Sequence, residues 1–83
     1  MYQVVLTSAA QKSLKKIDKR YRVRIDKALF ALAENPWLGK SLNGELDGFF
    51  SLRVWPYRII YTVYKNEAIV FVIDIDHRQD VYK

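Results

Sequence analysis

The spacing of apolar residues changes once along this chain, from the period of a helix to the period of a strand. Before Pro36, apolar side chains recur at steps of three and four residues, as in Ala10, Leu14 and Ile17. After residue 48, three runs rich in β-branched and aromatic residues follow: FFSLRV, YRIIYTVY and AIVFVIDI. A helical half followed by a strand-rich half predicts an α+β fold, with helices packed against a sheet.

The helical half contains two helices and a short strand before them. YQVVL has the composition of a strand, and Thr7 or Ser8 is a suitable cap for a helix over about residues 8 to 19. A second amphipathic helix follows almost directly and ends at Asn35, because Pro36 disfavours helical geometry in the residue before it. The short link between the helices predicts an antiparallel pair, each apolar on one side.

Residues 36–48 join the two halves. They hold all three glycines, in part as an Asn-Gly and an Asp-Gly pair, which is typical of a connecting loop. The links at residues 55–56 and 65–67 are short enough only for antiparallel hairpins, and the last run is apolar on both faces, as in an internal strand. We therefore predict a single domain over residues 1–83. Its N-terminal strand and helical hairpin pack on one face of a roughly four-stranded antiparallel sheet.

Composition and charge limit the classes of protein. With 51% hydrophobic residues the chain can form a packed core, and the absence of cysteine excludes disulfides and thiolate chemistry. The N-terminus has no basic leader, and no window approaches the ~20 apolar residues of a membrane span, so we expect a cytoplasmic protein without membrane contact. Fourteen Lys and Arg against nine Asp and Glu give a net charge of +5, which favours a polyanion or an acidic protein as partner.

Two arginines fall opposite each other in the predicted sheet. If the first hairpin turns at residues 55–56, Arg53 pairs with Arg58 on the face away from the helices. Like charges in direct opposition destabilise a sheet by about 0.2–1 kcal/mol, so the pair suggests a function. A guanidinium can give two parallel hydrogen bonds to a phosphate, and Phe49, Trp55 and Tyr64 offer surfaces for base stacking. The alternative is a pair of exposed arginines that only keep the sheet face soluble.

The last eleven residues, IDIDHRQDVYK, gather further polar groups. Histidine suits proton transfer near neutral pH, so His77 is a candidate general acid or base. Arg78 would add a third guanidinium, Lys83 a phosphate contact, and Tyr82 a second proton-transfer or orienting group. Two structural alternatives stay open: a histidine bonded to a neighbouring aspartate, and a tyrosine that packs on the core.

A metal ion is not needed for the chemistry that these groups suggest. RNA cleavage requires that the ribose 2′-hydroxyl lose a proton, that the leaving 5′-oxygen gain one, and that the phosphorane charge be stabilised. The product is then a 2′,3′-cyclic phosphate. A metal site at Asp74, Asp76 and His77 is disfavoured, because residue 77 points to the other face of a strand and hard cations prefer more oxygen ligands. We expect no cofactor.

The order of these elements resembles a known family over nearly the whole chain. The specific part is LDGFFSLR, followed by YRIIY and then by VFVIDIDHRQDVY. In these segments the chain resembles the RelE/ParE toxin superfamily, and within it the RelE-like messenger-RNA interferases.

The resemblance implies an endoribonuclease that cuts messenger RNA in the ribosomal A site and is held inactive by a cognate, acidic antitoxin in a hetero-oligomer. By matching positions, it implies that Arg58 and Arg78 hold the scissile phosphate and that Tyr82 orients or activates the reacting groups. Arg53 matches a common basic position on the first strand of the sheet, and His77 a position that is basic or histidine in different members.

Two departures from the family pattern leave other functions open. The best-studied members carry lysines just before the Leu-Arg pair, where this chain has Phe49 and Ser51, so the proton transfer done there must be done elsewhere or not at all. A long basic C-terminal helix of some members is also missing. The alternatives are a ParE-like toxin that inhibits DNA gyrase by binding it, and a binding module without enzymatic activity.

Overall fold

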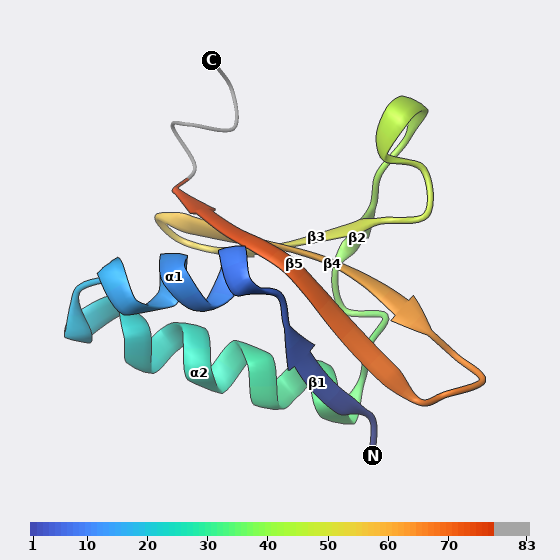
Figure 1. The fold of residues 1–83 in the computed structure, drawn as a ribbon, viewed down its shortest axis with the longest axis horizontal. Coiled ribbons are helices and arrows are strands. Elements are labelled where there is room, and N and C mark those ends of the chain that lie inside the picture. Colours follow the sequence, from blue (N-terminus) through green and yellow to red (C-terminus); the bar gives the residue numbers. More distant parts are fainter. Residues whose placement is uncertain (78–83) are drawn as a thin grey trace.

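The structure, a computed structural model, describes residues 1–77. Two helices are followed by a strand-rich half, as the sequence predicted (Figure 1). The elements, in chain order, are β1 (Gln3–Leu6), α1 (Ser8–Lys16), α2 (Lys19–Glu34), β2 (Lys40–Ser41), a 3₁₀ turn η1 (Gly44–Leu46), β3 (Phe50–Val54), β4 (Tyr57–Tyr64) and β5 (Ile69–His77). The predicted α+β class is therefore confirmed. Neither helix in residues 1–77 is long and apolar enough to cross a membrane.

The sheet is mixed and has five strands in the order β1-β5-β4-β3-β2, rather than about four antiparallel ones. The strands β2 to β5 pair antiparallel, but β1 pairs parallel with β5, so that Val4 lies opposite Val70. The parallel pair arises because the chain returns to β1 only after crossing through both helices and three strands. The extra strand, β2, is only two residues long, too short to show an alternating pattern in the sequence.

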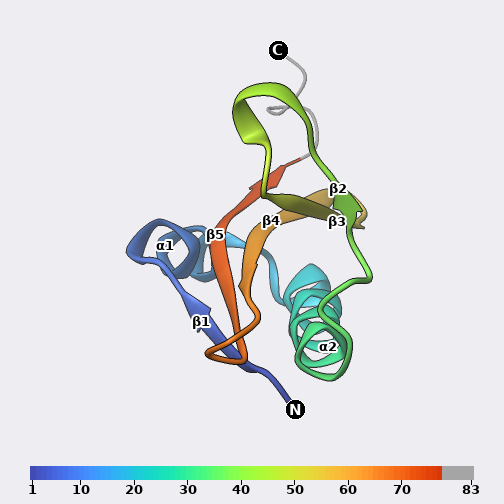
Figure 2. The ribbon, with the colours of Figure 1, turned by 90° about the vertical axis from the view of Figure 1, so that its right-hand side faces the viewer.

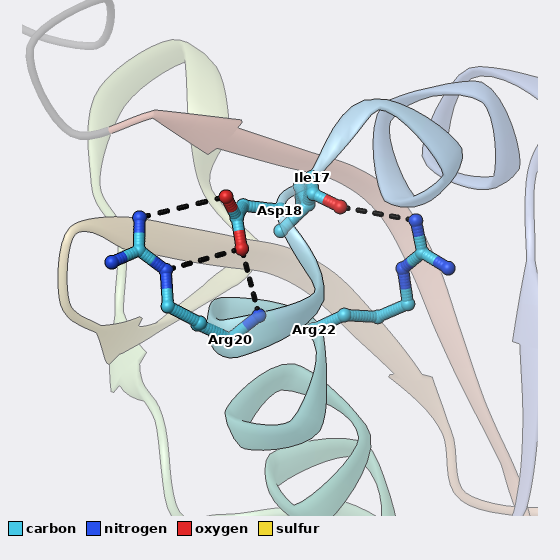
Figure 3. A network of polar contacts seen from close by, with 4 residues as sticks. All are labelled: Ile17, Asp18, Arg20 and Arg22. Atoms are coloured by element: carbon cyan, nitrogen blue, oxygen red, sulfur yellow. Dashed lines mark hydrogen bonds and ion pairs between the residues drawn. The ribbon is translucent and has the colours of Figure 1, made fainter.

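Side-chain caps at each helix start fix the helical half. The Thr7 hydroxyl accepts from the Ala10 amide at 3.1 Å and starts α1. Asp18 starts α2 by accepting from the Arg20 amide at 2.9 Å, and the Arg20 side chain contacts the same carboxylate (Figure 3). Arg22 of α2 donates to the Ile17 carbonyl at 3.0 Å, which satisfies an orphan carbonyl at the end of α1.

One hydrophobic core joins both helices to one face of the sheet. Its members have at most a few per cent of their surface exposed: Ala10 and Ile17 of α1, Ile25 and Leu32 of α2, and Ile59, Tyr61, Val70, Val72 and Ile75 of the sheet. Figure 2 shows the loop that contains η1 at the top, away from both helices. The second face of the sheet, whose side chains alternate with the core residues, lies outside this core.

A bulge interrupts the pairing of β4 with β5. Tyr61 lies opposite Val72, but the next pair is Ile60 with Asp74, so Ile73 is an extra residue in β5. The start of α1 covers this bulge: the Thr7 hydroxyl donates to the Ile73 carbonyl at 2.6 Å. Because strand side chains alternate between faces, one extra residue reverses the face of every residue that follows it.

Candidate functional site

Arg53 and Arg58 are direct cross-strand partners in the β3–β4 hairpin. The register places Val54 opposite Tyr57 and Leu52 opposite Ile59, and these four side chains pack against the core. The two arginines alternate with them and therefore point to the open face. The predicted register of this hairpin is confirmed.

Both arginines line one groove on the open face, about 600 Å³ in volume. Its walls are Leu38 and residues 40–43 on one side and residues 51–53 with Arg58 on the other. Of these nine residues, three are cations, namely Lys40, Arg53 and Arg58, and none is acidic. A concave surface of this size and charge suits a phosphate-bearing ligand.

Lys40 is the groove residue that the sequence did not single out. It lies opposite Ser51 in the β2–β3 pair, one of the two positions where the family resemblance leads us to expect a lysine. Arg53 follows Ser51 by two residues, so Lys40 and Arg53 are diagonal neighbours about 7–8 Å apart at the backbone. A lysine side chain reaches across that distance. The groove thus has an ammonium group, supplied by a strand too short to be recognised in the sequence.

A buried tyrosine holds the wall that carries Lys40. The Tyr61 hydroxyl donates to the Pro36 carbonyl at 2.8 Å and accepts from the Gly39 amide at 2.9 Å. Burial raises the pKa of the Tyr61 phenol, although the hydrogen bond from Gly39 opposes the rise. These bonds join the core strand β4 to Pro36 and to Gly39, the residue immediately before Lys40, so the position of the ammonium group depends on the packing of the core.

His77 lies across the sheet from the arginines. It is the partner of Tyr57, and the two rings meet edge-on with their centroids 5.3 Å apart on the helix side. Asp76, one residue earlier, is the residue opposite Arg58. The register therefore puts the His77 imidazole on the other face of the sheet from the two guanidinium groups, because the bulge at Ile73 turns residue 77 to that face, and its catalytic role stays a prediction.

One aspartate of β5, Asp74, helps to hold α1 against the sheet. Asp74 accepts hydrogen bonds from the Ser13 hydroxyl at 3.0 Å and from the Ile75 amide at 2.8 Å. Among residues 1–77, no group of three or more His, Asp or Glu side chains is placed to hold a metal ion. The register places Asp76 opposite Arg58 and His77 opposite Tyr57, so these two residues lie on different faces as predicted, while the Asp74 carboxylate bonds to α1.

The remaining predicted contacts lie apart from the groove or outside the described residues. Trp55 is 56% exposed at the hairpin turn, two residues after Arg53, and does not line the groove. Tyr64 is six residues along β4 from Arg58, about 20 Å at strand spacing, so it cannot stack on the same nucleotide. Arg78, Tyr82 and Lys83 lie beyond the described residues, and their roles stay predictions.

Comparison with known proteins decides the family. A sequence model described as the ParE toxin of the type II toxin–antitoxin system parDE matches residues 4–82. This chain is a toxin of the RelE/ParE family. The family assignment made from the C-terminal segments is thereby confirmed, and with it membership of a type II toxin–antitoxin system.

Curated relatives match this RelE/ParE toxin over nearly its whole length. Toxin RelG of Mycobacterium tuberculosis is 33% identical over 84 residues, which is 99% of this chain and 97% of the relative. Toxin RelE of the same organism is 30% identical, over 99% of this chain and 87% of its own. The family relation is therefore not confined to the strand-rich half.

Solved structures of RelE toxins share the fold. The toxin–antitoxin complex RelBE2 from Mycobacterium tuberculosis matches with a TM-score of 0.86 and 33% identity, over 93% of this chain and 98% of the matched chain. The isolated Escherichia coli RelE toxin matches with a TM-score of 0.80 and 28% identity, over 99% of this chain and 92% of the other. Several of the matched structures, RelBE2 among them, are complexes of a toxin with its antitoxin.

Proposed function

We propose that this toxin is an endoribonuclease that cleaves messenger RNA, at the ribosome, without a metal ion. The observation that carries the proposal is the groove in which Arg53, Arg58 and Lys40 gather with no carboxylate among the lining residues. The like-charged pair costs stability in the empty toxin, a cost that Asp76 on the other side of Arg58 offsets in part, and a bound phosphodiester would reverse what remains. The relatives named RelE and RelG support the same choice.

In the proposed reaction the ribose 2′-oxygen attacks the adjacent phosphorus and the 5′-oxygen leaves, giving a 2′,3′-cyclic phosphate. Arg58 holds the non-bridging oxygens of the scissile phosphate, and Arg53 contacts the same or the flanking phosphate. Both act as electrostatic clamps, because a guanidinium does not give up its proton in proteins. Arg78 and Tyr82 keep the roles that the family resemblance implies, namely phosphate binding for Arg78 and orientation or activation of the reacting groups for Tyr82.

The position of His77 argues against a role inside the groove. Its ring packs against Tyr57 on the helix side, and the sheet separates it from the cation-lined groove. The stabilising contact with Tyr57 accounts for the residue without catalysis. We therefore assign proton transfer to other groups, and His77→Ala is the control that tests this assignment.

The test is cleavage of messenger RNA in a translating extract, with the 5′ ends mapped by primer extension. The purified toxin should give discrete cuts, and Arg58→Ala should abolish them, because it removes the clamp on the phosphorane. His77→Ala should retain the cuts if the protein stays folded. A wild-type toxin that leaves every messenger intact would refute the proposal.

Inhibition of DNA gyrase is the second candidate, favoured by the match to the ParE family model. It requires a protein-binding surface and no phosphate clamp. A toxin that blocks supercoiling of plasmid DNA by gyrase, with no cut in the messenger and no effect of Arg58→Ala, would establish this function in place of RNA cleavage. A toxin that does neither would support a binding module.

A further inference from the structure

We infer that Lys40 is a catalytic residue that protonates the departing 5′-oxygen. The inference rests on the proposed RNA cleavage and adds the proton donor that this reaction needs. Among the groove-lining residues, Arg53 and Arg58 are guanidinium groups and retain their protons, whereas the ammonium of Lys40 can transfer one. The other polar groups of the groove are Ser41, Asn43 and Ser51, and neither a hydroxyl nor an amide is a comparable acid.

The sheet register brings the ammonium group within reach of the clamped phosphate. Lys40 is opposite Ser51, and Arg53 is the next residue of β3 on the same face. Arg58 then lies opposite Arg53, about 4.5–5.5 Å away between Cβ atoms. The three cations therefore form a continuous row across β2, β3 and β4 on the open face, so one phosphodiester can contact all of them.

The short strand β2, which carries Lys40, is held in place by a hydrogen bond from the residue before it. A strand of two residues at a sheet edge is mobile unless something holds it, and here the Tyr61 hydroxyl bonds the Gly39 amide directly before it. The ring of Tyr61 is fully buried. A proton donor must be held in a defined geometry at the leaving oxygen, and this anchor supplies it.

The proposed step balances as follows. The bond between the 2′-oxygen and phosphorus forms while the bond between phosphorus and the 5′-oxygen breaks. The 2′-proton leaves to solvent water, the 5′-oxygen takes a proton from Nζ of Lys40, and the amine regains a proton from solvent. Ser51 beside it on the neighbouring strand leaves room for the long side chain to lie over the groove.

The experiment uses a substrate whose leaving group needs no proton. Two messengers are compared on programmed ribosomes, one ordinary and one in which sulfur replaces the bridging 5′-oxygen at the mapped cut. A thiolate leaves without protonation, so loss of a general acid slows only the ordinary substrate. Lys40→Ala and Lys40→Arg should both cleave the ordinary messenger about 10²–10⁴-fold more slowly. Both should match the wild type on the sulfur-containing one.

The variants separate proton transfer from charge. Lys40→Arg keeps the positive charge, so recovery of ordinary cleavage in that variant alone would show that Lys40 only attracts phosphate and would overturn the inference. Equal slowing on both messengers, or unchanged cleavage by Lys40→Ala, would overturn it too. Lys65→Ala, at an exposed lysine beyond the opposite end of β4, is the matched control. If the wild type cleaves neither messenger, the proposed function fails together with the role of Lys40.

Discussion

Arg53 and Arg58 stand opposite each other in an antiparallel hairpin, two like charges on one face of the same groove. A hairpin selected only for stability would carry an opposite charge or a neutral residue at one of the two positions. The arrangement therefore exchanges some stability for a binding surface, and the two properties can be measured separately.

Arg53→Gln should stabilise the toxin and weaken its function. Removal of one charge relieves the repulsion, so the free energy of unfolding in urea should rise by about 0.2–1 kcal/mol. Messenger cleavage should fall, because one phosphate contact is lost. Lys12→Gln, at an exposed position of α1, should change neither quantity. Lower stability in Arg53→Gln would contradict the repulsion, and unchanged cleavage would contradict the role in RNA binding.

Tyr61→Phe should lower the free energy of unfolding by about 1–3 kcal/mol, because it leaves the Pro36 carbonyl and the Gly39 amide without their hydroxyl partner. Chemical denaturation at neutral pH measures this loss. Tyr64→Phe, at a half-exposed tyrosine, is the control and should cost little.

The phenol of Tyr61 should also make the free energy of unfolding depend on pH. Burial raises the pKa of Tyr61 above its ordinary value of 10.0, so its contribution is complete below about pH 10 and is lost as the pH rises through the folded value. The wild type should therefore lose more stability than Tyr61→Phe across that alkaline range. Parallel denaturation curves for the two proteins at high pH would show that the phenol is not protected.

Gly39→Ala should disturb the groove wall. A Cβ at this position would lie 2.5 Å from the Tyr61 hydroxyl oxygen and 3.0 Å from the Ser51 carbonyl oxygen. The ring is buried and cannot move aside, so we expect a loss of about 1–3 kcal/mol in unfolding free energy. The double variant with Tyr61→Phe removes the closest contact, and its loss should be smaller than the sum of the two single losses. Additive losses would show that the two residues do not interact.

Much of this arrangement could be predicted from the sequence, because it depends on short-range rules. The length of the turn at residues 55–56 fixed the pairing of Arg53 with Arg58, and Pro36 fixed the end of α2. Lys40 could not be predicted as a groove residue, since two residues show no period. The face of His77 could not be predicted either, because a single bulged residue, Ile73, reverses it and leaves no compositional mark.

Asp18 should contribute to stability in a pH-dependent way. The Arg20 amide, and then its guanidinium, hold the pKa of the Asp18 carboxyl below its ordinary value of 3.8. Its contribution is therefore present above about pH 4 and is lost as the pH falls through the folded value. Asp18→Asn keeps an oxygen that can cap α2, so it should lower the melting temperature less than Asp18→Ala does. Equal effects would show that the cap bond is not the source.

The complex with the antitoxin should weaken as salt is added, if acidic side chains of the antitoxin meet the three groove cations. Titration of the cognate antitoxin at several salt concentrations measures the slope. A triple variant in which Lys40, Arg53 and Arg58 are all replaced by Gln should show a shallower slope than the wild type. Identical slopes would place the antitoxin contacts away from the groove.

The parallel pairing of β1 with β5 links the first and the last of the strands in residues 1–77. Residues 3–6 have no strand partner until residues 69–72 have been made, so the sheet cannot be completed on a partial chain. Fragments released early in translation would lack both the finished sheet and strand β4, which carries Arg58. The topology thus delays the harmful activity of a toxin until residues 69–72 have been made, which gives the producing cell an interval in which an inhibitor can already be present.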